Sequence, residues 1–246
     1  MTQHLSPEEL ITEVTRALDE LQDQLRALPD EDFAKPSSLP DWTVSQLVAH
    51  LHSFARAAIR QFANAGSANP PEMYDGGMAG RVEAINMAAL MRPDSLRPLA
   101  LDSLDELRAV LPGTAQKWEE NVGYRPGATV ADMMHATWRE MLIHATDLDE
   151  FKRPAASWPR SFSEHLIRAL QPRVAETDRI VLQPHGKEPI VLGEGAHSYV
   201  LTGTDFDLAA WLAGRPPQGV VQASSDAELS DFPTLLPWPS GQLLPR

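Results

Sequence analysis

Helix-start signals followed by apolar stripes restrict the first 150 residues of this chain to a helical fold. Ser6-Pro7-Glu8-Glu9 and Thr43-Val44-Ser45-Gln46 each place a hydroxyl three residues before a Glu or Gln, which is the pattern of a capping box. Apolar residues then recur at the helical period, so both segments are predicted as long amphipathic helices. The two stripes are Leu10, Val14, Leu18, Leu21, Leu25 and Leu28, and Leu47, Val48, Leu51, Phe54, Ile59 and Phe62.

Two more helices are predicted before residue 150. Asp94 or Ser95 can cap the third helix, and Thr129 can cap the fourth. Residues 72–91, which contain two adjacent glycines, are predicted as a loop with a short helix. The stripes that follow the caps are Leu96, Leu99, Leu104, Leu107 and Leu111, and Val130, Met133, Met134, Met141, Ala145 and Leu148. Four amphipathic helices in this order predict a four-helix bundle.

The sequence pattern changes after residue 150. A fifth helix is predicted from Ser161 to about Val174, and a last helix over 205–213. Short β-like runs occupy 179–182, 189–192 and 198–201, and 220–222 is a further strand candidate. We therefore expect an α+β chain with two domains, a four-helix bundle over 1–150 and a small α+β domain over 151–246. The Pro-rich tail of the second domain, from Pro233 onward, is predicted to be extended.

Composition excludes several classes of function. The formal charge of −13 repels phosphate backbones, and no cluster of Lys and Arg offsets it, so we expect no nucleic-acid partner. Apolar runs are far shorter than the roughly 20 residues of a membrane span. The N-terminus lacks the basic start and apolar run of a signal peptide, so we expect a cytoplasmic protein. We also expect a monomer or weak dimer.

The chain contains no cysteine. Disulfides, thiolate metal ligands and a protein-borne sulfur nucleophile are therefore absent. If thiol chemistry takes place on this protein, a small molecule must supply the sulfur.

Three residues on two predicted helices could bind a metal ion. Glu140 and His144 lie four residues apart on the inward face of the fourth helix, and His50 lies on the inner edge of the second. A buried Glu is costly unless it is paired or coordinates a metal. Two imidazoles and one carboxylate form the ligand set of a catalytic zinc with an open position. Alternatively, Glu140 pairs with Arg139 or a neighbouring arginine, and the two histidines are ordinary core residues.

The neighbouring histidines do not fit this set. His52 lies about 200° around its helix from His50, and His135 lies about 180° from His144, so both are predicted to face elsewhere. Asp147, three residues after His144, could orient that imidazole or simply lie at a helix end.

Two segments carry a resemblance to a known family. Residues 39–51 (LPDWTVSQLVAHL) and 138–148 (WREMLIHATDL) resemble two motifs of the DinB-like metal-binding bundles, and in particular of the mycothiol-dependent maleylpyruvate isomerase family. Residues 211–215 (WLAGR) resemble a segment of that family's C-terminal domain. The resemblance spans nearly the whole chain and implies that His50, Glu140 and His144 bind zinc, with mycothiol or a related thiol as cosubstrate.

The resemblance also implies a reaction. Thiolate addition to maleylpyruvate would allow rotation about the former cis double bond, and elimination would give fumarylpyruvate. Arg215 matches the family's catalytic or substrate-binding arginine, although it could instead be a surface residue bonded to the preceding carbonyls. Arg81 and Tyr74 are candidates for the thiol or substrate pocket, or else part of a solvated loop. A mycothiol S-transferase and a non-catalytic metal-binding bundle remain as alternatives.

Overall fold

The computed structural model describes residues 5–148, 153–225, 232–239 and 243–246. The chain forms two compact units that divide between residues 152 and 153. The predicted domain boundary at 150/151 lies outside the described residues. Each unit has its own secondary structure and its own buried residues.

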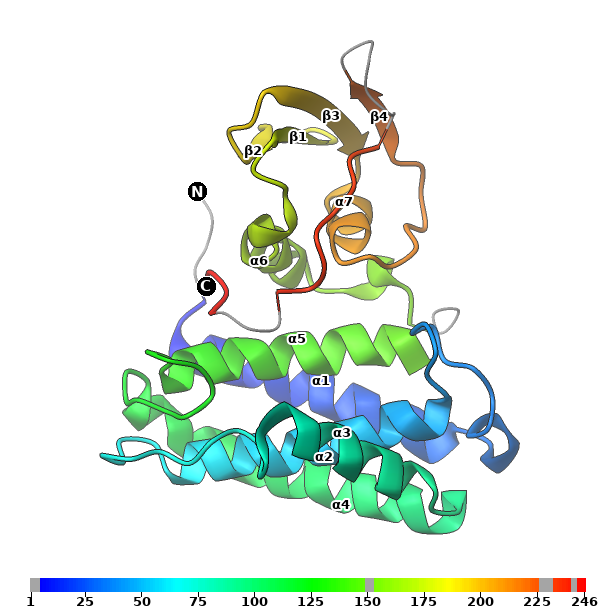
Figure 1. Ribbon diagram of the computed structural model, residues 1–246, viewed down its shortest axis with the longest axis vertical. Helices are drawn as coiled ribbons and strands as arrows, with labels where there is room; N and C mark the ends of the chain where they lie inside the picture. Colours follow the sequence, from blue (N-terminus) through cyan, green and yellow to red (C-terminus); the bar gives the residue numbers. More distant parts are fainter. Residues whose placement is uncertain (1–4, 149–152, 226–231, 240–242) are drawn as a thin grey trace. The chain divides into compact units, whose positions relative to one another are not determined.

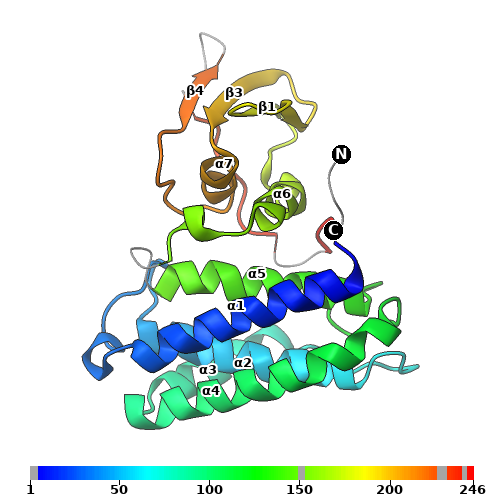
Figure 2. The same cartoon turned by 180° about the vertical axis from the view of Figure 1, so that it is seen from behind.

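The N-terminal unit is built from long helices (Figures 1 and 2). Helices α1 (Pro7–Ala27), α2 (Val44–Ala63), α4 (Pro93–Val110) and α5 (Val130–Leu148) form the bundle. Helix α2 packs against α4 and α5, α1 packs against α5 and α4, and the shorter α3 (Gly77–Ala89) packs against α2. Short 3-10 turns occupy Asp30–Asp32 and Leu111–Lys117.

Both predicted capping boxes are present. Ser6 and Thr43 each accept a hydrogen bond from the backbone of the third helical residue, and the Glu9 and Gln46 side chains bond back to the cap. The apolar stripes that follow are buried, and Leu10, Leu18, Leu47 and many of their neighbours have no exposed surface. The sequence therefore predicts both the start and the buried face of α1 and α2.

Two helical predictions need correction. Neither Asp94 nor Ser95 caps α4, because the helix begins at Pro93 with Arg92 in the capping position. The fixed φ of proline suits the first turn of a helix, so the helix starts before the predicted caps. The segment 72–91 is mostly helix rather than loop, since α3 covers 13 of its residues. The sequence of α3 has no continuous apolar stripe, and only Ile85 of this helix is buried.

The C-terminal unit is a small α+β module, which confirms the predicted fold class. Its sheet has the order β2-β1-β3-β4, with β1 and β3 parallel and the outer pairs antiparallel. The strands are β1 (Asp178–Pro184), β2 (Ile190–Leu192), β3 (His197–Gly203) and β4 (Gln222–Ser225). Helices α6 (Arg160–Ala169) and α7 (Asp205–Leu212) pack against each other, and 3-10 turns lie at Ala155–Ser157 and Gln171–Arg173.

Two boundaries in this unit differ from the prediction. The fifth helix ends at Ala169 rather than near Val174, because Pro172 cannot continue an α-helix and the chain tightens into a 3-10 turn. The last strand begins at Gln222, so Val220 and Val221 precede it. In the tail, Leu236 donates its N–H to the carbonyl of Arg173, and residues 233–239 form no helix or strand.

Across the described residues, the helices are too short or too polar for any of them to traverse a lipid bilayer.

Candidate metal centre

Two neighbouring helices of the bundle bring three polar side chains together. His50 comes from α2, and Glu140 and His144 lie one turn apart on α5. The His50 Nε2 atom lies 2.9 Å from Glu140 Oε2 and 3.0 Å from His144 Nε2. The third edge of this triangle, from His144 Nε2 to Glu140 Oε2, is 3.1 Å. The side chains that the sequence singled out as ligands therefore share one small volume.

The surroundings hold these side chains in place. The His50 side chain is only 4% exposed, and the Trp42 ring lies edge-on to it at a centroid distance of 5.8 Å. The alternative pairing of Glu140 with a neighbouring arginine is not the main contact, because its carboxylate oxygen lies between the two imidazoles. A carboxylate in this position is stabilised by two ring N–H groups or by a cation.

The donor set fits a divalent metal ion. Two ligands bonded to zinc at about 2.0–2.1 Å across a tetrahedral angle would lie about 3.3 Å apart, close to the spacing of these three atoms. Within the part of the chain that the structure describes, this is the one group of three or more His, Asp and Glu side chains suitably arranged for a cation. Three protein ligands leave a further coordination position open for a small molecule.

The charges of the cluster follow from burial and from its hydrogen bonds. Burial lowers the pKa of His50, so that this ring is neutral at pH 7. Burial also works against ionisation of Glu140, but hydrogen bonds from His144 and His50 hold its pKa well below the usual range. For His144, burial is outweighed by Asp147 and Glu140, which raise its pKa to about 9. Without a metal, the cluster is a carboxylate bonded to one imidazolium and one neutral imidazole.

Asp147 orients His144 from the side away from the cluster. Its Oδ2 lies 2.8 Å from His144 Nδ1, and its side chain is fully buried. The carboxylate accepts a hydrogen bond from Nδ1–H of His144 and thereby directs Nε2 of this ring toward Glu140 and His50. A carboxylate behind a metal-binding imidazole is a common arrangement, because it fixes the tautomer and the ring direction.

Arg81 and Tyr74 lie beside the cluster. The Arg81 Nη2 atom lies 3.1 Å from His50 Nδ1, and the guanidinium carbon lies 5.7 Å from the centre of the Tyr74 ring. Burial raises the pKa of Tyr74 to about 12, and the Glu140 charge adds to this effect. Arg81 belongs to α3 and not to a loop as the sequence predicted.

The contact between Arg81 and His50 has a consequence for metal binding. A guanidinium can only donate hydrogen bonds, so His50 Nδ1 must accept and Nε2 must carry the ring proton. A metal on Nε2 requires the opposite tautomer, in which Nδ1–H faces a second donor. Arg81 in its present position therefore opposes a metal ion on His50.

Arg215 belongs to the C-terminal unit. It follows the end of α7, and its Nη1 atom donates to the Ala213 carbonyl at 2.8 Å. The loop after it is held by the buried Asp207, whose Oδ1 accepts the N–H groups of Gln218 and Gly219 at 2.9 and 2.8 Å. The bond to Ala213 matches the surface-residue alternative, and the catalytic role of Arg215 stays a prediction.

The remaining histidines of these helices lie apart from the cluster. His52 bonds to the Leu99 backbone, and His135 Nδ1 lies 2.8 Å from the Ala131 carbonyl oxygen. Sequence reasoning missed a group of polar residues on the outer face of α2, where His52, Arg56 and Arg60 line a cavity. Their spacing of four residues was the signal that places them on one side of the helix.

Comparison with known proteins gives the same family from sequence and from structure. Residues 14–149, more than half of the chain, match the family model described as the mycothiol maleylpyruvate isomerase N-terminal domain. A crystal structure of the mycothiol-dependent maleylpyruvate isomerase is 25% identical with a TM-score of 0.81, and covers 93% of this chain and 97% of its own. A variant of that enzyme with one histidine replaced by alanine matches at 24% identity with the same TM-score and coverage. No curated protein sequence matches the chain.

Proposed function

Because this chain belongs to the mycothiol maleylpyruvate isomerase family, we propose that it converts maleylpyruvate to fumarylpyruvate with mycothiol as cosubstrate and a divalent metal ion on His50, Glu140 and His144. The observation that carries the proposal is the convergence of these three donor atoms within 3.1 Å of one another. The family relationship supports the thiol dependence, and the ligand set supports zinc as the metal.

The metal would supply the one function that the side chains lack, because a bound Zn²⁺ lowers the pKa of a thiol and so provides a thiolate at neutral pH. The protein residues perform the remaining tasks. Asp147 holds His144 in the orientation needed for binding. The absence of cysteine means that no protein thiol competes for the site.

The isomerisation needs no net consumption of the thiol. The sulfur adds to one carbon of the cis double bond, and the electron pair moves into the adjacent carbonyl as an enolate. Rotation about the resulting single bond and expulsion of the thiolate then give the trans isomer. Arg215 is our candidate for holding a substrate carboxylate or the enolate, since a guanidinium binds such oxygens with two hydrogen bonds.

The test is a panel of thiols with maleylpyruvate on zinc-loaded protein. Mycothiol, bacillithiol, glutathione and ergothioneine are supplied one at a time, and fumarylpyruvate and free thiol are both measured. We expect turnover with mycothiol and an unchanged thiol concentration. Consumption of one thiol per turnover would instead identify an S-transferase, and no turnover with any thiol would contradict the proposal.

A further inference from the structure

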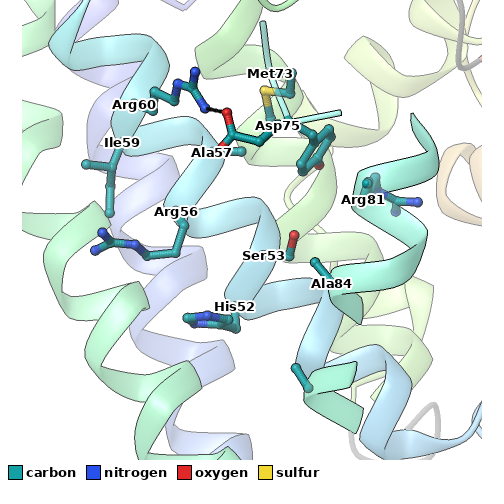
Figure 3. Close-up of a pocket in the computed structure, with 13 residues that line it drawn as sticks. His52, Ser53, Arg56, Ala57, Ile59, Arg60, Met73, Asp75, Arg81 and Ala84 are labelled. Atoms are coloured by element: carbon teal, nitrogen blue, oxygen red, sulfur yellow. Dashed lines mark hydrogen bonds and ion pairs between the residues drawn. The ribbon is translucent and has the colours of Figure 1, made fainter. Parts of the chain in front are cut away.

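One face of α2 borders a cavity in the N-terminal unit. The cavity has a volume of about 580 Å³ and lies between α2, α3 and the segment that joins them. Figure 3 shows His52, Ser53, Arg56 and Arg60 along α2, with Arg81 and Ala84 on the facing α3. None of the three candidate metal ligands lines it. The volume lies within the range of about 300–1,000 Å³ that is typical of small-molecule sites.

The polar groups around this cavity suit a hydroxyl-rich ligand. Arg60 is paired with Asp75, and Arg56 is paired with Glu106, so two of its guanidinium groups already have carboxylate partners. Ser53 and Tyr74 add two hydroxyl groups to the wall. Donors and acceptors are therefore interleaved, which suits hydroxyl groups that both donate and accept.

The cavity adjoins the metal centre through Arg81. This side chain lines the cavity, and its Nη2 atom also reaches His50 Nδ1 at 3.1 Å. A ligand that filled the cavity would therefore lie one side chain away from the candidate metal ligands. A small dicarboxylate would leave most of the cavity empty, whereas a thiol with a bulky body would fill it.

We propose that this cavity binds the hydroxyl-rich, non-reacting part of the thiol cosubstrate, while the sulfur lies toward His50, Glu140 and His144. The inference rests on the proposed function, because it takes a low-molecular-weight thiol to be the cosubstrate. It assigns a binding role to residues of α2 and α3 that hold no metal.

Filling the cavity tests this assignment. Ala84 is an exposed residue of α3 that lines the cavity, and Val82 is an exposed residue of the same helix that does not. Ala84→Phe should occupy the binding space, and Val82→Phe is the matched control. The probe is S-methylated mycothiol, which keeps the body but cannot form a thiolate, titrated calorimetrically into the full-length, metal-free protein.

We expect the probe to bind the wild-type and V82F proteins equally, and the A84F protein at least about tenfold more weakly. In the zinc-loaded enzyme, A84F should raise the KM for mycothiol far more than the KM for N-acetylcysteine, which lacks the body. Equal binding by all three proteins would overturn the proposal. Competition between the probe and maleylpyruvate in the metal-free protein would also overturn it, because the cavity would then belong to the electrophile.

A second substitution covers the case in which A84F does not fold, as thermal unfolding would reveal. Arg60→Met removes the guanidinium donors from a partly exposed side chain, and Arg16→Met on α1 is its control. R60M should weaken binding of the probe, and R16M should not. Equal affinities of the two variants for the probe would refute the assignment. If no thiol supports turnover, the proposed function fails, whereas the binding measurement still decides the cavity.

Discussion

Metal binding to this cluster should compete with a single proton. Asp147 and Glu140 outweigh burial and raise the pKa of His144 to about 9, whereas His50 and Glu140 release no net proton on metal binding at pH 7. At pH 7, only about one His144 ring in a hundred is neutral, which weakens the apparent affinity by about 2.7 kcal/mol. Apparent affinity for Zn²⁺ should therefore rise about tenfold per pH unit and level off above about pH 9.

Replacing Asp147 by Asn separates two effects of opposite sign. Loss of the carboxylate lowers the pKa of His144, so proton competition weakens near neutral pH. Loss of the orienting bond costs about 10- to 100-fold in intrinsic affinity, as is typical for the residue behind a metal-binding imidazole. D147N should therefore bind much more weakly than wild type at pH 9.5, yet differ less from it at pH 7.

The assay is a competition titration of zinc against a chelator of known affinity from pH 6.5 to 9.5. Calorimetry in buffers of different ionisation enthalpy gives the protons released, which should be about one for wild type at pH 7. Asp132→Asn is the matched control, because Asp132 lies on the same helix but bonds to Thr129 at its start. A D147N protein with the wild-type pH slope would refute the reasoning.

Three further substitutions test individual side chains. His144→Ala should abolish stoichiometric zinc binding, measured by elemental analysis, and with it activity, because it removes one of three ligands. Arg215→Ala should lower turnover by about 100-fold or more at unchanged zinc content, and wild-type kinetics would remove Arg215 from the site. Arg81→Ala should tighten zinc binding by about tenfold, because it removes both a positive charge and the donor that stabilises the wrong tautomer of His50. Weaker binding by R81A would contradict that argument.

The parts of the fold that the sequence predicted are those with a strong local signal. Helices α1 and α2 begin at capping boxes and bury continuous stripes, so both their starts and their inner faces follow from spacing. Helix α3 buries only Ile85 and has no capping side chain, so nothing local distinguishes it from a loop. Its presence depends on packing against α2, which the sequence does not display.

The candidate site divides in the same way. The pair Glu140 and His144 could be placed on one face of a helix from their spacing alone, whereas their distance to His50 depends on how α2 packs against α5. Arg81 could not be placed by spacing, because its position beside His50 depends on α3. The cavity on the outer face of α2 was hidden for the same reason, since α3 provides its second wall.

The hydrogen bonds of the cluster also explain how a metal site can be folded before the metal arrives. A buried Glu140 would destabilise the bundle if it were left unpaired. Here the imidazolium of His144 supplies the positive charge, and the Nε2–H of His50 supplies a second donor. Arg81 keeps that proton on Nε2 by occupying Nδ1. The incoming cation thus replaces one proton on His144 and shifts another on His50. The metal-free protein should therefore be folded. The free-energy cost of metal binding then comes from moving these protons and not from ordering the backbone.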